Sequence, residues 1–490
     1  MKGIIFNVTQ NAHLSRPLGG HRIAHYLRDL GWDVEVVDWA NHWTFEELQQ
    51  FAKRKYDDKL LFIGFSQLFS HWDDTLEKFG AWFKSCYPHV PILCGSSVNP
   101  MYHTDVVDYY FQGFSENALL VLLKYLYSNG SKPKFKFGDK KIISANDHYP
   151  AYPLESLMVK YEDRDYINAD EWLTIEFSRG CKFRCSYCNF PILGVKGDYS
   201  RSQDDFKEQL DDAYDRFGCT NYLISDETFN DRTEKIKKFA DVVETLNYDT
   251  WFSGYIRADL LVSRKEDKEH LLRMNFLGQY YGIESFNHQS AKAVGKGLNS
   301  DKLKQGLIDS KKYFLKNGSQ RYRGHISLIC GLPHETKKST HESFDWCAEN
   351  WNDQAFSMFP LLVPRDNGLN IVSKFTTDFQ KYGYELLSPN EIDSTRPVAV
   401  DTEYTKGIRQ LVVEMELWKN KDMNIYDAVE TVQEVYKKRD KIKFMPGPWA
   451  LGYRLKKNAT VDDRLKLDFT RLDALLDDKI ENYKIRKLGV

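Results

Sequence analysis

The sequence predicts an α/β protein whose residues 1–135 form a Rossmann-like, doubly wound parallel sheet. Short apolar runs alternate there with amphipathic, helix-like stretches such as Gly20–Leu30. The runs are Gly3–Val8, Val34–Asp38, Leu60–Phe65 and Pro91–Gly95. A chain of 490 residues, 42% of them hydrophobic, is also long enough to bury two or three cores. Alternation of this kind is typical of parallel sheets with helices on both faces.

Composition narrows the class of protein. The formal net charge is only -2, so no bulk attraction to nucleic acid or to a membrane surface is expected. No apolar run approaches the roughly 20 residues of a membrane span. The chain has 8 cysteines and its first residues read as a strand rather than a secretory leader. Reduced thiols in a cytoplasmic setting are therefore expected.

Three cysteines, Cys181, Cys185 and Cys188, share one short loop with the spacing C-x3-C-x2-C. The apolar run Trp172–Phe177 reads as a strand that leads into this loop, and Gly180 permits a tight turn. A [4Fe–4S] cluster normally takes a thiolate at each of its four irons. Three thiolates leave one iron open, where a substrate or cofactor can bind.

The spacing of these cysteines is also compatible with three plainer roles. A zinc site needs a fourth ligand, but the next thirty residues supply only the isolated Cys219. A disulfide framework fits poorly with 8 cysteines in 490 residues. Three unrelated core cysteines with this spacing are the remaining alternative.

The loop resembles the cluster loop of the radical S-adenosylmethionine (SAM) superfamily. The likeness extends to Tyr187 before the third cysteine, and the Ser178-Arg-Gly-Cys181 lead-in is similar to the branch with an N-terminal cobalamin-binding domain. It covers roughly residues 1–365. The resemblance implies a partial, TIM-like (β/α)6 barrel over residues 166–370 that cleaves SAM to methionine and a 5′-deoxyadenosyl radical. It also implies an electron donor such as flavodoxin or ferredoxin.

Five further strands are expected in the barrel, each ending near a polar or glycine-rich turn. They are Asn221–Ser225, Thr250–Ile256, Gln279–Ile283, His325–Cys330 and Phe356–Leu362. By resemblance, the residues that contact SAM are Tyr187, Ser225, Asp226, Glu227, Arg257, Glu284, Gly331, Leu332 and Pro333. Carboxylates suit the methionine amino group and an arginine fork suits its carboxylate.

Plainer roles compete with these assignments. Asp226 or Glu227 can cap the following helix, and Arg257 and Glu284 can form surface ion pairs. His334 stands where the family text Gly-Leu-Pro-Gly-Glu-Thr has its second glycine, and no role is assigned to it.

Cobalamin is the second cofactor that the resemblance implies. Candidate contacts at the carboxyl ends of the first sheet are His13, Gly19, Gly64, Ser66, Gly95, Ser96, Ser97 and Gly113. The family's cobalt-ligating pattern Asp-x-His-x-x-Gly is changed at two of its three positions around His13, which favours a surface loop histidine over a cobalt ligand. A Rossmann-like domain that binds no corrin remains the alternative.

The rest of the chain is a linker and a helical region. Residues 136–165 are Lys-rich and then carry two prolines, which favours an extended connection. Residues 371–490 are expected to be mainly helical, notably at Tyr426–Lys438 and Leu465–Ile485, and to shape the substrate pocket. No cysteine follows Cys347, which argues against auxiliary clusters bound by cysteine.

Three functions follow as hypotheses. The first is a radical SAM enzyme that uses cobalamin to methylate or rearrange an unactivated carbon. The second is a cobalamin-independent radical isomerase or dehydrogenase. The third is a non-catalytic binding protein with a structural cluster. The sequence names neither a substrate nor further catalytic residues.

Overall fold

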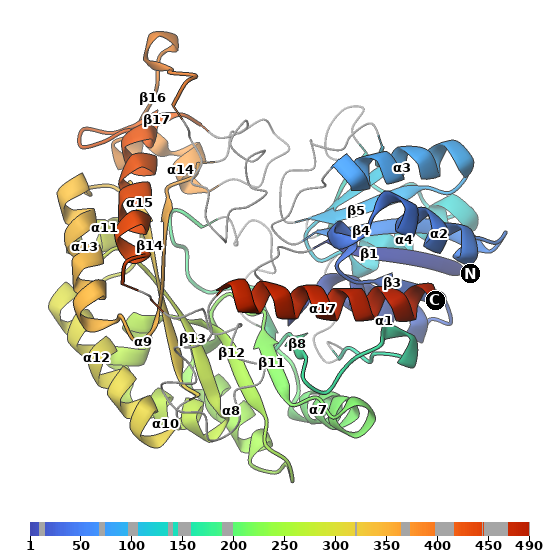
Figure 1. Ribbon diagram of the computed structural model, residues 1–490, viewed down its shortest axis with the longest axis horizontal. Coiled ribbons are helices and arrows are strands. Elements are labelled where there is room, and N and C mark those ends of the chain that lie inside the picture. Colours follow the sequence, from blue (N-terminus) through green and yellow to red (C-terminus); the bar gives the residue numbers. More distant parts are fainter. Residues whose placement is uncertain are drawn as a thin grey trace.

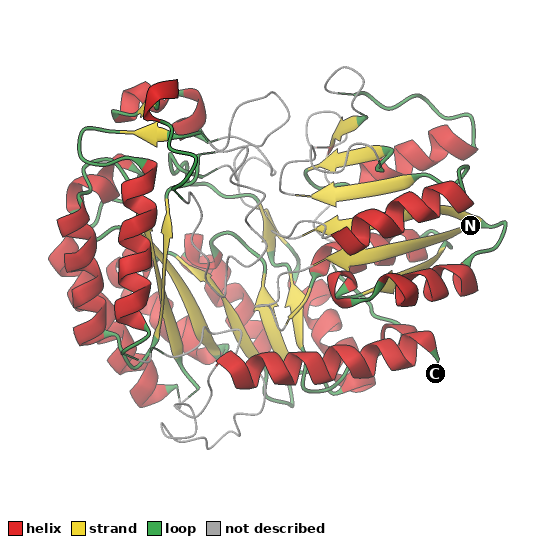
Figure 2. Cartoon of the chain, turned by 45° about the horizontal axis from the view of Figure 1, so that its top comes forward, coloured by secondary structure: helices red, strands yellow, loops and turns green. Residues whose placement is uncertain are grey.

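Two parallel sheets lie side by side in the molecule, each covered by helices (Figure 1, Figure 2). The computed structural model describes residues 1–8, 15–67, 74–96, 106–135, 141–145, 158–188, 199–318, 321–363, 373–396, 416–442, 444 and 469–489. Within these ranges, no helix combines the length and the apolarity needed to cross a membrane.

The first sheet has six parallel strands in the order β3-β1-β4-β5-β6-β7. They are β1 (Lys2–Val8), β3 (Asp33–Val37), β4 (Leu60–Gln67), β5 (Ile92–Ser96), β6 (Tyr109–Gln112) and β7 (Ile142–Ser144). Its helices are α1 (Leu18–Asp29), α2 (Phe45–Lys55), α3 (Asp74–Cys86) and α4 (Glu116–Tyr127). Separate hydrophobic cores lie on the two faces. The predicted Rossmann-like sheet is confirmed, with its strand order reversing between β1 and β4, where such sheets bind ligands.

The second sheet has seven parallel strands in the order β15-β14-β13-β12-β11-β8-β2. Six of them are β8 (Trp172–Ile175), β11 (Asn221–Ile224), β12 (Trp251–Ile256), β13 (Phe276–Glu284), β14 (Arg323–Cys330) and β15 (Ala355–Pro360). The intervening helices include α7 (Gln203–Phe217), α8 (Thr233–Val243), α12 (Ser300–Asn317) and α13 (Lys337–Asn350). The largest core of the protein is built on these elements. This curled sheet confirms the partial barrel that the resemblance implied.

Two short strands differ from the expected organisation. The seventh strand of the barrel sheet, β2 (Ser15–Arg16), comes from the N-terminal part of the chain and pairs with Trp172 and Leu173 of β8. Strand β7 lies within residues 136–165, which were expected to be a linker, and extends the first sheet alongside β6. Backbone pairing with a distant strand, rather than a strong apolar run, makes both segments strands.

The C-terminal region contributes helices to both halves. Helix α15 (Ile425–Arg439) packs along β15 and α13, while α17 (Phe469–Leu488) lies across from the second sheet to the first (Figure 1). Four apolar side chains of α17 are buried in the core of the first sheet, those of Leu476, Ile480, Tyr483 and Leu488. Helical structure at the two expected places is thus confirmed.

Arg16 is the centre of a buried ionic network between the two sheets. Its guanidinium donates to Asp38 Oδ2 and to Glu171 Oε2, each at 2.5 Å, and its own side chain is 1% exposed. Tyr483 of α17 donates to the carbonyl of Val36 at 3.2 Å, and its ring lies 5.0 Å from the Arg16 guanidinium carbon. The network therefore ties β2, the first sheet and α17 together.

Candidate functional site

The cluster loop begins where β8 ends. A two-strand ladder closes its base, with β9 (Ser178–Arg179) antiparallel to β10 (Tyr199–Ser200). Gly180 has φ 87°, a left-handed conformation that glycine adopts without cost, so the expected tight turn is present. The backbone N–H of Cys188 then donates to the carbonyl of Cys185 at 3.1 Å, which folds the loop back on itself.

The three loop cysteines differ in setting from most other cysteines of the chain. Cys181, Cys185 and Cys188 are half-buried and not in disulfides, while Cys94, Cys219, Cys330 and Cys347 are buried. Burial raises the pKa of the Cys219 thiol to about 12 and those of the other three higher still, which keeps them protonated. The loop thus presents a group of thiols that a metal can reach.

The donor set fits a cluster better than a single ion. In the part of the chain that the structure describes, no three His, Cys, Asp or Glu side chains come together as the ligands of one metal ion would. A [4Fe–4S] cluster makes a different demand, since each thiolate binds its own iron. Three thiols on one loop meet that demand and leave one iron open.

Arg257, at the end of β12, packs directly against the cluster loop. Its Nη1 lies 3.5 Å from Cys185 Sγ, its Nη2 donates to the carbonyl of Gly295 at 2.8 Å, and its Nε donates to Asp259 Oδ1 at 2.9 Å. The ring of Phe183 stacks on the guanidinium at 4.1 Å. Arg257 therefore lies beside the cluster loop, held by Asp259 and the loop rather than exposed in a surface pair.

Two neighbouring carboxylates after β11 serve different purposes. Asp226 faces inward, where its Oδ1 accepts the backbone N–H groups of Phe177 and Ser178 at 2.8 and 3.1 Å. Its Oδ2 accepts Ser178 Oγ at 2.5 Å and pairs with Lys235 at 3.5 Å. These bonds use both oxygens, so Asp226 fixes the start of the cluster loop and has little left for a ligand.

Glu227, by contrast, has a buried oxygen for which the described residues supply no partner. This oxygen is Oε2, and the Glu227 carboxyl is close enough to Cys181 to act on that thiol electrostatically. Burial and the charge of Asp226 raise the pKa of Glu227 well above its usual value. A buried carboxyl with an unused acceptor next to the cluster loop fits the ammonium group of SAM.

Glu284, at the end of β13, ties the loop to the opposite side of the barrel. Its Oε1 accepts from Tyr187 Oη and from Lys296 Nζ, both at 2.7 Å. Glu284 itself has φ 64°, a strained conformation for a residue with a side chain. Burial and the Glu284 charge raise the pKa of Tyr187 well above its usual value, which keeps the phenol a donor.

The turn after β14, residues 331–333, packs against the C-terminal region. Gly331 has φ 102°, and a Cβ there would lie 2.5 Å from the ring of Trp418. Tyr384 Oη donates to the Gly331 carbonyl at 2.7 Å. Leu332 is fully buried in the barrel core and Pro333 is also buried, so this turn can reach a ligand mainly through its backbone. Ser225 is exposed on the rim.

His334 occupies a backbone conformation that favours glycine. Its φ is 67°, which explains why the family text has glycine at this place. We expect His334→Gly to raise the free energy of unfolding by about 1 kcal/mol, because the left-handed strain is removed at some cost in chain entropy. Denaturant unfolding would measure it. His288→Gly, at the first position of α11 (His288–Ala293), is the control and should destabilise or change nothing. A loss of stability in His334→Gly would contradict the prediction.

Glu335 gives the fold a pH dependence. It is 2% exposed and accepts from Ser285 Oγ at 2.5 Å and from the backbone N–H of Gly331 at 3.2 Å. Burial raises its pKa to about 7, against 4.5 in the unfolded chain. The folded state keeps a proton that the unfolded chain has lost, so the contribution is full below pH 4.5 and is lost as pH rises through 7.

The size of that loss is about 3 kcal/mol of unfolding free energy. In Glu335→Gln, the free energy of unfolding, measured by urea unfolding, should fall less between pH 5 and 7.5 than it does in the wild type. Glu342→Gln, in α13, which begins two residues after Glu335, has a side chain that is 63% exposed and should keep the wild-type slope. An unchanged slope in Glu335→Gln would refute the assignment.

The candidate cobalamin residues lie mostly along one edge of the first sheet. A Cβ at Gly19 would meet Ser66 Oγ at 2.8 Å, which places α1 against β4 at the reversal of strand order. Near the end of β5, no atom of the described part of the chain lies within 4 Å of a Cβ built on Gly95, and Gly113 has φ 90° after β6. Gly64 lies inside β4, paired with Ile5 and Leu93, and is further from the edge than predicted.

Three other candidates of this group are less informative. Ser96 pairs through its backbone with Gln67 at the end of the sheet. His13 and Ser97 lie outside the described residues, so the geometry adds nothing to either prediction.

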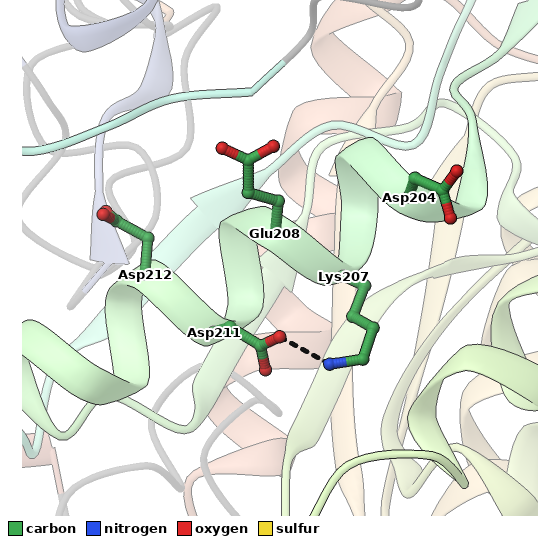
Figure 3. Close-up of a pocket in the computed structure, with 5 residues that line it drawn as sticks. All are labelled: Asp204, Lys207, Glu208, Asp211 and Asp212. Carbon is green, nitrogen blue, oxygen red and sulfur yellow. Dashed lines mark hydrogen bonds and ion pairs between the residues drawn. The ribbon is translucent and has the colours of Figure 1, made fainter.

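A surface hollow on α7 contains none of the predicted residues. It is lined by Asp204, Lys207, Glu208, Asp211 and Asp212 (Figure 3). The carboxylates spread along a solvent-facing helix, and one of them, Asp211, pairs with Lys207 at 2.5 Å. We therefore interpret the hollow as part of a solvent-exposed acidic face of α7.

Two functional contacts were missed by the sequence analysis. Lys296, which pairs with Glu284, lies between Gly295 and Gly297 with no strand or motif to mark it. Lys235 pairs with Asp226 and Asp231 from inside α8, where a lysine normally indicates a solvent face. Only its spacing of four residues from Asp231 hints at an ion pair.

Comparison with known proteins agrees with this geometry. Residues 175–347 match the model of the radical SAM superfamily. An uncharacterized methyltransferase of Synechocystis sp. is 20% identical over 163 residues, 33% of this chain. The chain spans only 30% of that relative's length.

Solved structures resemble the whole chain. The radical SAM methyltransferase TsrM from Kitasatospora setae, with tryptophan substrate and a SAM analog, has a TM-score of 0.64 at 13% identity, covering 99% of this chain and 98% of that one. The cobalamin-dependent SAM radical enzyme OxsB, with aqua-cobalamin and SAM, has a TM-score of 0.54 at 14% identity, covering 99% and 71%. Residues 175–347 therefore form a radical SAM domain, and the chain as a whole has the fold shared by TsrM and OxsB.

Proposed function

We propose that the protein is a radical SAM enzyme that uses cobalamin to methylate or rearrange an unactivated carbon. The observation that carries the proposal is the loop of three thiols beside Glu227, whose buried Oε2 has no hydrogen-bond partner among the residues that the structure describes. TsrM and OxsB, which share the fold, bind cobalamin, and TsrM also holds a [4Fe–4S] cluster. A cluster supplies the electron that splits SAM, and cobalamin supplies a methyl carrier.

The chain's own residues would bind and orient SAM. Glu227 accepts the ammonium, while Arg257 presents a guanidinium edge to the carboxylate from beside Cys185. Tyr187 and Lys296 hold Glu284 at the rim, where its second oxygen can accept a ribose hydroxyl. The backbone of Gly331–Pro333 offers a flat edge to adenine. Together these contacts would hold the reacting sulfonium in one orientation and keep water away.

The N-terminal sheet would hold the corrin at the edge marked by Gly19, Ser66, Gly95 and Gly113. Gly95 leaves open space there, and Gly19 lets α1 approach β4 closely. A one-electron donor such as flavodoxin or ferredoxin would supply the cluster, in a cytoplasmic, reducing compartment.

Anaerobic reconstitution tests the proposal in two steps. Reduced protein with iron, sulfide and SAM should release 5′-deoxyadenosine, and protein desalted after hydroxocobalamin should keep the corrin absorbance. Extracts incubated with methyl-labelled SAM should then gain label in a product. A loaded cluster that releases no 5′-deoxyadenosine would overturn the enzyme assignment, and a corrin-free protein would overturn the use of cobalamin.

Glu227 gives a sharper test of the SAM site. We expect Glu227→Gln to weaken SAM binding about 10- to 100-fold, because a charge-assisted hydrogen bond is worth roughly 1.5–3 kcal/mol. Titration of SAM into the reduced protein, followed by the change in cluster electron paramagnetic resonance (EPR), would measure it. Glu234→Gln, exposed on α8, is the control and should bind SAM as the wild type does. Equal affinities in the two variants would exclude Glu227 from the site.

A further inference from the structure

Four buried charges form a chain between the N-terminal sheet and the cluster loop. Arg22 on α1 donates Nε to Glu116 Oε1 at 3.2 Å, and the same oxygen accepts Arg179 Nη2 at 2.5 Å. Arg179 Nε in turn donates to Glu176 Oε1 at 2.8 Å. The charges alternate along the chain, so the network is neutral as a whole.

The chain of charges is shielded from water. The side chains of Arg22, Glu116, Arg179 and Glu176 are only 4%, 2%, 2% and 8% exposed. The guanidinium of Arg179 also lies over the ring of Phe114 at 4.2 Å. Burial alone would raise the pKa of Glu116, but the two arginines outweigh it and lower that pKa to about 2. Glu116 therefore stays charged at neutral pH.

Stability alone is a poor reason for such a network. Two charges lose as much on leaving water as they gain from one another, so apolar side chains of similar volume usually stabilise a contact at least as well. The network instead fixes the orientation of one part of the protein relative to the other. The planar fork of Arg179 bonds two carboxylates at fixed angles, which sets where the two protein parts lie.

Each end of the central pair belongs to a predicted cofactor site. Glu116 is the first residue of α4 and follows the turn of Gly113 and Phe114, at the edge of the first sheet proposed to hold the corrin. Arg179 is in β9, two residues before Cys181. One ion pair thus joins the two sites directly.

We propose that Glu116 and Arg179 are positioning residues that fix the cluster loop relative to the edge of the N-terminal sheet. The pair touches neither reacting group but determines the separation across which the two cofactors act. This inference rests on the proposed function because it assumes that a cluster is bound. The contacts of the ion pair itself do not depend on that function.

A distance measurement in the holoprotein tests the proposal. Cys86, at the end of α3, is an exposed thiol of the N-terminal domain and can carry a nitroxide once the cluster is assembled. Pulsed dipolar EPR then gives the distance distribution between this label and the reduced, paramagnetic cluster. We expect a single narrow distribution in the wild type and a broader or displaced one in Glu116→Gln and Arg179→Lys, at unchanged iron and sulfide content.

Glu35→Gln is the matched control. Glu35 is also a buried carboxylate of the N-terminal sheet, paired with Lys487 at 2.5 Å, but it does not touch the cluster loop. The control should lose thermal stability comparably and keep the wild-type distribution. A wild-type distribution in Arg179→Lys, or an equal change in Glu35→Gln, would overturn the positioning role.

The inference and the proposed function fail in different ways. If Glu116→Gln does not fold, Arg179→Lys decides, since it keeps the charge and loses only the fork. If the wild type takes up no cluster, the proposed function fails. The same comparison then uses nitroxides on Cys86 and Cys185 in a background of Cys181→Ser and Cys188→Ser, where an unchanged distribution in Arg179→Lys again overturns the inference.

Discussion

Cys185→Ala is expected to abolish cluster binding and SAM cleavage, with 5′-deoxyadenosine falling to the level of protein without iron. Cys185 lies beside Arg257, whose Nη1 is 3.5 Å from its sulfur, and the Cα of Cys185 would lie 3.7 Å from a Cβ built on Gly295. Two remaining thiolates leave two iron corners without protein ligands, where a cube normally has one thiolate at each iron. Iron content, visible absorbance and product release measure the effect.

Cys347→Ala is the control for this variant. Cys347 is fully buried in α13 within the barrel core, and burial raises the pKa of its thiol. Its loss removes only buried volume, at a cost of about 1 kcal/mol of stability, and should leave the cluster intact. A variant Cys185→Ala that still binds a full cluster and cleaves SAM would refute the assignment of the loop.

Arg16→Met should lower the free energy of unfolding by about 3–5 kcal/mol, the largest stability effect that we expect from one side chain. The substitution keeps an apolar stem of similar length but removes the 2.5 Å contacts of Asp38 and Glu171, both fully buried. The basic groups that stay beside them are more distant, with the His21 ring at 3.0 Å from Asp38 and Lys479 at 3.4 Å from Glu171. Bonds from Arg16 to the carbonyls of Asp165 and Tyr166, at 2.7 and 3.0 Å, are lost as well. Urea unfolding followed by tryptophan fluorescence would measure the change.

The comparison variant is Arg273→Met. Arg273 also bonds two carboxylates, those of Asp241 and Glu244, but its side chain is 24% exposed and theirs are 36% and 50% exposed. Ion pairs in water contribute at most about 1 kcal/mol, so this variant should lose little. Equal losses in the two variants would show that burial does not set the strength of the Arg16 network.

The strands could be predicted wherever burial on both faces produces an uninterrupted apolar run. That condition holds for β1, in which every residue after Lys2 is buried. It does not hold for β2, which is only Ser15 and Arg16 and becomes a strand by pairing with β8, far along the chain. Partners distant in sequence leave no periodic mark on a two-residue segment.

Spacing predicted the cluster loop because three ligands for one cluster must be close in the chain. It could not separate the roles of Asp226 and Glu227, which are adjacent and of the same chemistry. Their difference arises because the backbone N–H groups of Phe177 and Ser178 face one carboxylate and not the other. Contacts across strands of this kind are a property of the fold, not of the local sequence.

Helix α17 has a consequence for how the protein is made. Glu35 and Asp38 lie in and beside β3, yet Lys487 and Tyr483, which bond to them, are made some 450 residues later. A nascent chain leaving the ribosome therefore carries an unfinished first sheet until translation reaches α17: the Glu35 carboxylate lacks Lys487, and the backbone N–H of Asp38 lacks Tyr483. Maturation of the amino-terminal half must wait for the carboxyl-terminal helix.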